Sequence, residues 1–111
     1  MDVINAYLEK TMNIVDIHFT DGVRPYQDVR PHVKCKDGFT ISVQAGTFYY
    51  SCPKFDGAIP YETVELGYPS SPDELIMAYA ENPDEPCDTV YGYVPVDIVC
   101  QLVEKHGGIA D

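Results

Sequence analysis

Apolar and polar residues alternate most regularly in the segment FTISVQA (39–45). Its odd-numbered positions are apolar and its even-numbered positions are polar, so one face of an extended strand would be buried. The residues of that apolar face are Phe39, Ile41, Val43 and Ala45. The preceding segment HVKC is also extended in pattern, and Asp37-Gly38 between the two supplies the positive φ that a tight hairpin turn needs. The sequence therefore predicts an antiparallel β-hairpin.

Three segments around this hairpin carry weaker strand signals. NIVDIHF (13–19) alternates enough to be a strand, and a TDG turn follows it. VRPYQDVRP (23–31) contains two prolines, which restrict it to a loop or to the edge of a sheet. TFYYSC (47–52) would continue the sheet after a bend at Gly46.

Two later segments complete the predicted sheet. YETVELGY (61–68) places Val64 and Leu66 on the inner face and Glu65 on the outer face of a strand. TVYGYV (89–94) is short and rich in residues that favour strands. The loop CPKFDGAIP (52–60) separates the first of these strands from the hairpin.

Helix signals occur at both ends of the chain. In DVINAYLEK (2–10), one side of a helix would carry Val3, Ile4, Tyr7 and Leu8. The last helix would start at Pro95, with Gly107 as its left-handed C-terminal cap. Its apolar stripe consists of Ile98, Val99, Leu102 and Val103.

A third helix is predicted in SSPDELIMAYAE (70–81). Ser71 would cap it, Pro72 would take the first helical position and Glu74 would complete a capping box. Taken together, the chain predicts a single α+β domain over residues 1–111. Its architecture would be a small antiparallel sheet of about four strands with two helices packed on one face.

The net negative charge comes entirely from the second half of the chain. The net charge is −11, yet the first half contains as many Lys and Arg as Asp and Glu. No Lys or Arg stands between Lys54 and Lys105. Such a charge either keeps a solvated surface soluble or attracts a basic partner protein. The candidate partner-binding residues are Glu62, Glu65, Asp73, Glu74, Glu81, Asp84, Glu85 and Asp88.

Tyrosines accompany these carboxylates and would add rigid contact area to a binding surface, while some of them belong to the core. They are Tyr61, Tyr68, Tyr79, Tyr91 and Tyr93. The sequence pI of about 4.4 argues against direct binding of nucleic acid or of an anionic membrane. No apolar run reaches the ~20 residues of a spanning helix, and the start MDVINAYLEK lacks a basic leader, so a cytoplasmic protein is expected.

The cysteines admit a structural zinc site, although they form no CxxC pair. The best ligand set is Cys35, Cys52, Cys87 and His32, with His106 as a further candidate. The alternative is that small thiols fill the core, which suits Cys100 best. A thiol hydrolase built on Cys52 and His106 lacks any recognisable oxyanion element, so no catalytic residue is predicted.

The segments DGFTISVQAGTFYYSCPKFDG, YETVELGYPS and DTVYGYVPVDIV, with the later KHGG, carry a resemblance. The chain resembles a family of short uncharacterised proteins of tailed bacteriophages and prophages over residues 35–108. That resemblance implies a phage origin and the cytosol of the bacterial host, but no reaction. In size and acidity the chain is also similar to phage inhibitors of host defence, including anti-CRISPR proteins.

These observations predict a non-enzymatic, acidic interaction protein that inhibits a host defence factor. The expected partner is a basic host protein, in particular a CRISPR nuclease whose nucleic-acid channel presents Lys and Arg. The alternatives are a phage housekeeping or regulatory protein, and a small zinc-stabilised protein or thiol enzyme.

Overall fold

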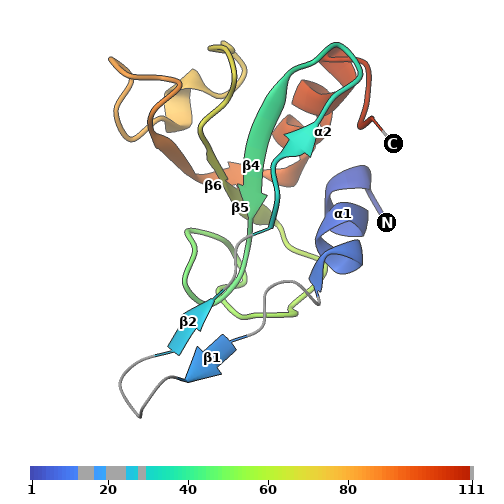
Figure 1. Ribbon diagram of the computed structural model, residues 1–111, viewed down its shortest axis with the longest axis vertical. Coiled ribbons are helices and arrows are strands. Elements are labelled where there is room, and N and C mark those ends of the chain that lie inside the picture. Colours follow the sequence, from blue (N-terminus) through green and yellow to red (C-terminus); the bar gives the residue numbers. More distant parts are fainter. Residues whose placement is uncertain (13–16, 20–24, 28–29, 111) are drawn as a thin grey trace.

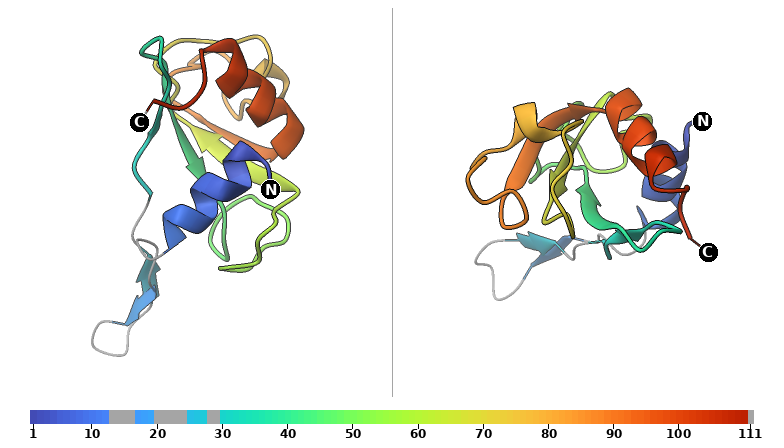
Figure 2. Two further views of the ribbon diagram at one scale, coloured as in Figure 1. Left: turned by 90° about the vertical axis from the view of Figure 1, so that its right-hand side faces the viewer. Right: turned by 90° about the horizontal axis from the view of Figure 1, so that it is seen from above.

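The computed structural model describes residues 1–12, 17–19, 25–27 and 30–110, with the backbone alone in 17–19 and 25–27. Its centre is an antiparallel sheet whose four strands neighbour one another in chain order (Figure 1). The strands are β3 (Val33–Lys34), β4 (Thr40–Gln44), β5 (Thr63–Gly67) and β6 (Val90–Pro95). Helices α1 (Val3–Lys10) and α2 (Val96–Lys105) lie side by side on one side of the sheet (Figure 2). The predicted α+β fold is confirmed.

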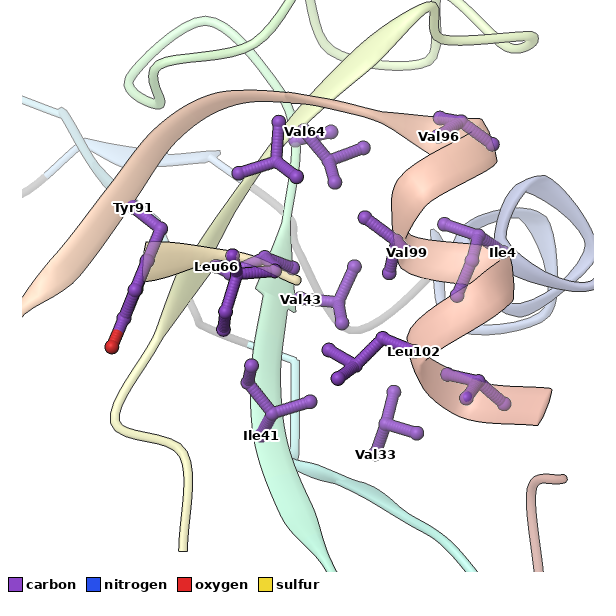
Figure 3. Close-up of a cluster of buried hydrophobic side chains, with 14 of the residues drawn as sticks. Ile4, Val33, Ile41, Val43, Val64, Leu66, Tyr91, Val96, Val99 and Leu102 are labelled. Carbon is purple, nitrogen blue, oxygen red and sulfur yellow. The ribbon is translucent and has the colours of Figure 1, made fainter. Parts of the chain in front are cut away.

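The hydrophobic core fills the space between the sheet and the two helices (Figure 3). Its central side chains are Ile4, Val33, Ile41, Val43, Val64, Leu66, Tyr91, Val96, Val99 and Leu102. Fully burying one aliphatic side chain stabilises a protein by about 1.5–3 kcal/mol. All four apolar side chains predicted for the inner face of residues 39–45 are buried. The polar positions depart from strict alternation at Gln44, which is also buried and bonds the backbone of Arg30.

The β3–β4 hairpin closes as the sequence predicts. The Cys35 amide donates to the Phe39 carbonyl at 2.8 Å, and the Gly38 amide donates to the Cys35 carbonyl at 3.0 Å. Gly38 has a φ of 99°, a backbone conformation that residues with a Cβ rarely adopt. The Asp37 carboxylate accepts the Phe39 amide at 2.9 Å, so the turn residue stabilises its own turn.

A bulge interrupts the pairing of β5 with β6. Two residues of β6, Gly92 and Tyr93, stand opposite a single residue of β5, Glu65. Tyr93 adopts a φ of 52°, the left-handed region that non-glycine residues seldom occupy. Bulges of this kind re-aim side chains at the edge of a sheet. Here the bulge turns the Tyr93 ring outward, where 49% of the residue is exposed.

The two helices end as the sequence predicts but depend on packing for their stability. Helix α1 has 8 residues, which is too short to persist alone. Its Asn5 side chain is buried and bonds both backbone groups of Tyr61, at 3.1 Å through Nδ2 and at 2.7 Å through Oδ1. Helix α2 is closed by Gly107, whose φ is 91°. The predicted apolar stripe of α2 is buried except for Ile98, which is half-buried.

A buried arginine lies between the main sheet and helix α1, just after a second, smaller sheet in the chain. Strands β1 (Ile17–Phe19) and β2 (Pro25–Gln27) form a two-stranded sheet of their own, which projects from one end of the molecule (Figure 1). Arg30 is 2% exposed and follows β2. Its Nε donates to Thr11 Oγ1 at 2.8 Å, and its terminal nitrogens donate to the Leu8 and Ala45 carbonyls at 3.2 Å each. The guanidinium thereby joins the end of α1 to the end of β4.

The strand predicted in residues 13–19 is confirmed in its last part by β1, and residues 13–16 lie outside the described residues. The turn predicted at 20–22 also lies outside them. The segment 23–31, predicted as loop or edge, contributes the short strand β2.

The strand predicted for residues 47–52 is wrong. The chain turns after Gly46, and only Cys52 makes an isolated bridge, to Thr63. The buried Ser51 hydroxyl accepts the Gly46 amide at 3.1 Å and folds the segment back on itself. The segment therefore forms hydrogen bonds within itself instead of pairing with a neighbouring strand.

The helix predicted for residues 70–81 is also wrong. The segment forms turns and a single 3₁₀ helix, Met77–Tyr79. Asp73 is 5% exposed, and its carboxylate accepts the Leu75 amide at 3.0 Å while also contacting Lys105. A side chain bonded to its own backbone competes with the helical pattern, and the contact with α2 holds it in place.

Replacing Arg30 by Met should lower the free energy of unfolding by about 2–4 kcal/mol, because two carbonyls and a hydroxyl would lose a buried donor. Urea denaturation followed by circular dichroism measures the change. Lys34→Met is the matched control, because Lys34 is exposed and should change stability by about 0.5 kcal/mol or less. Equal losses in both variants would contradict a special role for the buried guanidinium.

Candidate functional site

The eight carboxylates predicted to bind a partner fall into three groups. Glu81, Asp84, Glu85 and Asp88 are all exposed in the loop of residues 81–88, which we call the acidic loop. Glu62 and Glu74 are exposed in other segments. Glu65 is half-buried, and Asp73 is buried. Because Asp73 is covered and ion-paired, it is not part of an accessible binding surface.

Glu62 lies far from the acidic loop. It precedes Thr63 at the start of β5, whereas the acidic loop leads into Val90, which pairs with Gly67 at the other end of β5. Five residues of a strand span roughly 15 Å. Glu62 instead lines a cavity with Asp97 beside the first turn of α2. The structure therefore does not gather all eight carboxylates on one surface, and the acidic loop is their densest group.

The backbone of the acidic loop is fixed by hydrogen bonds that leave its carboxylates in solvent. The Asn82 amide donates to Thr89 Oγ1 at 3.0 Å, and the Asp88 amide donates to the Glu85 carbonyl at 2.9 Å. The buried Tyr91 donates its hydroxyl to the Pro86 carbonyl at 2.5 Å. None of the four carboxylates of the acidic loop pairs with a basic side chain of the described residues. The loop thus presents, on an ordered frame, negative charges that no described Lys, Arg or His neutralises.

The charge of Asp73 belongs to a separate cluster centred on His106. The imidazole Nδ1 lies 2.7 Å from Asp37 Oδ2, and Nε2 lies 3.1 Å from Asp73 Oδ2. Lys105 Nζ also contacts Asp73, at 3.1 Å. The Phe39 ring stacks on the imidazole with centroids 4.0 Å apart. We call this group the His106 cluster; it joins the β3–β4 turn, the segment after β5 and the end of α2.

The contacts of the His106 cluster favour the charged forms of the imidazole and of the two carboxylates. Burial acts in the opposite direction on His106, yet its hydrogen bonds to the two carboxylates raise the imidazole pKa above the usual 6.5. Burial would also raise the pKa of Asp73, but hydrogen bonds from the Leu75 amide and His106 hold it below 3.8. The hydrogen bond from the Phe39 amide and the contact with His106 lower the pKa of Asp37.

The five tyrosines singled out in the sequence divide between core and surface. Tyr61 and Tyr91 are buried, and Tyr79 is half-buried. Tyr68 and Tyr93 are 48% and 49% exposed, and both have a φ of 52°. A non-glycine residue in this backbone region costs roughly 1–3 kcal/mol, and such residues concentrate at functional sites.

A cavity of about 200 Å³ opens beside Tyr93, and we call it the tyrosine pocket. It is lined by Tyr50, Tyr79, Glu81, Val90, Gly92 and Tyr93. Sequence reasoning missed Tyr50, because the segment 47–52 was predicted to continue the sheet as a strand. The sequence signal near the pocket is the glycine in TVYGYV, which marks a close approach to that strand without identifying Tyr50 as the residue that makes it. The pocket shares Glu81 with the acidic loop.

The predicted zinc ligands are not brought together. Cys35 is buried beside the β3–β4 turn and pairs with Ile109, whereas Cys52 pairs with Thr63 at the start of β5. Cys87 is exposed in the acidic loop. In the described part of the chain, no three His, Cys, Asp or Glu side chains form a group that could hold a metal ion. The zinc site therefore stays a prediction without geometric support.

The thiol dyad of Cys52 and His106, which the sequence does not favour, gains no support from the geometry. Both imidazole nitrogens of His106 face carboxylates, so neither is free to take a proton from a thiol. Burial raises the pKa of the Cys35 and Cys100 thiols, which disfavours their reactive thiolate form.

No helix in the described ranges combines the length and apolar character needed to cross a membrane. Comparison of the chain with protein families, with curated proteins and with solved structures gave no match. The resemblance to phage proteins therefore stays a prediction.

The His106 cluster should make the protein more stable at about pH 6 than at about pH 9. The folded state raises the His106 pKa, so this contribution is complete below pH 6.5 and is lost as pH rises through the folded pKa. The lowered pKa values of Asp37 and Asp73 act at the other end, where stability falls as pH drops below about 3.8. Urea-denaturation midpoints between pH 3 and pH 9 measure both the loss of stability at high pH and the loss at low pH.

In His106→Gln, the difference in urea midpoint between pH 6 and pH 9 should shrink. His32 is the control, because it is exposed and His32→Gln should leave the difference unchanged. An unchanged pH dependence in His106→Gln would contradict the assignment.

Proposed function

We propose that this protein acts by binding, without catalysis, a basic surface of a partner protein, and that the acidic loop carries most of the contact. The observation that supports the proposal is the set of four exposed carboxylates on a frame held by backbone and tyrosine hydrogen bonds. Charges on an ordered loop bind without the entropic cost of ordering the chain. A solvated surface that served only solubility would not require this order.

The chemistry of such a partner follows from the charge. Proteins that handle nucleic acids line their channels with Lys and Arg placed for phosphates. An acidic protein can occupy those positions, and complementary charge raises association rates by about 10- to 1,000-fold. Binding there would exclude the nucleic acid by direct competition.

The finer form of the proposal is a phage-encoded inhibitor of a host defence nuclease, with a CRISPR nuclease as the favoured partner in the bacterial cytosol. It is supported by the acidic loop and by two resemblances. One is in sequence, to a family of short phage proteins, and the other is in size and acidity, to phage inhibitors of host defence. Glu62 and Glu74, both exposed, would contribute to the contact only if the partner surface extends beyond the acidic loop.

Neutralising the acidic loop should abolish inhibition of a purified CRISPR nuclease, measured as cleavage of a target DNA with guide RNA. The test variant combines Asp84→Asn, Glu85→Gln and Asp88→Asn, and it leaves Glu81 intact because Glu81 also lines the tyrosine pocket. The control removes the same number of exposed charges outside the candidate binding residues, as Glu9→Gln, Asp97→Asn and Glu104→Gln. Raising the salt from about 0.05 M to 0.5 M should weaken inhibition by the wild type at least about tenfold, because screening shortens the range of the attraction.

Equal inhibition by the two variants, or inhibition insensitive to salt, would contradict the role of the acidic loop. No inhibition of any nuclease by the wild type would overturn the finer form. The broader form, binding of a basic partner protein through the acidic loop, would then be tested by capture from host lysate. The wild type and the control variant should capture a basic protein at low salt and lose it at high salt, and the acidic-loop variant should not capture it.

A further inference from the structure

The tyrosine pocket combines two aromatic rings with a carboxylate. The rings of Tyr50 and Tyr93 lie 5.8 Å apart at an angle of 40°, so they form a wedge rather than a flat stack. Glu81 lines the same pocket. Gly92 forms part of the wall, and a Cβ on Gly92 would lie 3.4 Å from the Cβ of Tyr50. That distance is ordinary van der Waals contact, so Tyr50 packs directly against β6 at Gly92.

The exposure of the two rings is imposed by the backbone. The Tyr93 amide donates to the Tyr50 carbonyl at 3.0 Å, which holds the two residues together at the bulge. The φ of 52° at Tyr93 is unfavourable for a tyrosine, yet the ring is left 49% exposed instead of adding to the core. Tyr50 is 45% exposed. Tyr68 shares this φ and this exposure, so what distinguishes Tyr93 is its place in the pocket beside Tyr50 and Glu81.

Negative charge lies behind the wedge as well as in its wall. The half-buried Glu65 accepts the Tyr50 amide at 3.0 Å. Burial raises the pKa of Glu65 and the neighbouring charge of Glu81 raises it further, against the opposing effects of the Tyr50 amide and of Lys54. A cation seated against the rings, in the cavity that Glu81 also lines, would relieve this repulsion. The chain already contains one contact of a cation with these rings, because Lys54 Nζ lies 5.5 Å from the centroid of the Tyr50 ring.

We propose that the tyrosine pocket receives the guanidinium group of one arginine side chain of the partner protein. A planar guanidinium stacks on aromatic rings and presents several N–H donors to a carboxylate such as Glu81. The volume of about 200 Å³ suits a single side chain, since drug-sized ligands need roughly 300–1,000 Å³. The inference rests on the proposed function, because it supplies one specific contact at the border of the acidic loop.

The test is an NMR titration of the wild-type protein with N-acetyl-arginine amide, with N-acetyl-citrulline amide as the neutral probe of the same shape. We expect saturable shifts of the ring resonances of Tyr50, Tyr79 and Tyr93 with the arginine probe. The citrulline probe should bind about tenfold more weakly or not at all, because it lacks the positive charge. Equal binding of the two probes, or no saturable shift, would overturn the proposal.

Two tyrosine variants provide a matched comparison. Tyr93→Gly removes one ring of the wedge and suits the backbone, whereas Tyr68→Gly removes an equally exposed tyrosine with the same φ outside the pocket. Binding of the arginine probe should weaken about tenfold in Tyr93→Gly and stay unchanged in Tyr68→Gly. Equal effects in both would overturn the proposal. If Tyr93→Gly does not fold, Tyr50→Leu serves instead. Tyr50 bonds Glu65 and Tyr93 through its backbone atoms, so this substitution removes the ring and keeps both hydrogen bonds.

This test separates the failure of the pocket from the failure of the proposed function. The small probe needs no partner, so a pocket that does not bind arginine leaves the salt-sensitive effect of the acidic-loop variant intact. Conversely, if no partner depends on the acidic loop, the proposed function fails whether or not the probe binds.

Discussion

One imidazole between two carboxylates joins the parts of this fold that are far apart in the sequence. His106 at the end of α2 contacts Asp37 in the β3–β4 turn and Asp73 in the segment after β5. Because Asp73 is held there, the chain that follows it turns tightly and reaches Ala80, which pairs with Tyr91 at the edge of β6. The acidic loop and one wall of the tyrosine pocket begin at that point. The candidate surface therefore depends on a cluster that forms no part of it.

The elements that the sequence predicts well are those whose signals lie within a few residues of one another. The Asp37-Gly38 turn, the alternation after it and the glycine cap of α2 each use local chemistry, and each is present. The segment 70–81 has equally good local helix signals, yet it forms turns. Its deciding contact is the pairing of Asp73 with Lys105 and His106, some thirty residues away. A capping pattern read from one sequence cannot report such a contact.

The candidate site shows the same limit. Clustering in the sequence correctly indicated the acidic loop, because its four carboxylates share one short segment. It did not indicate that β5 separates Glu62 from that loop, or that Asp73 is buried. Tyr50 joins the site through backbone hydrogen bonds to Glu65 and to the bulge residue Tyr93, and the bulge is set by the register of two strands. Gly92 was the visible sign, but a lone glycine in a strand does not say which ring will approach it.

The margins of the four-stranded sheet restrict how another chain could join it. Along β3, the Ala110 amide donates to the Lys34 carbonyl at 2.7 Å, so the tail of the chain lies on that margin. Along β6, the Glu81 amide donates to the Val90 carbonyl at 3.0 Å, and the bulge distorts the remainder. A bare strand margin is a template on which foreign backbones add or proteins polymerise. With described backbone groups on both margins already occupied, intermolecular sheet extension is disfavoured, and selectivity must come from side-chain chemistry.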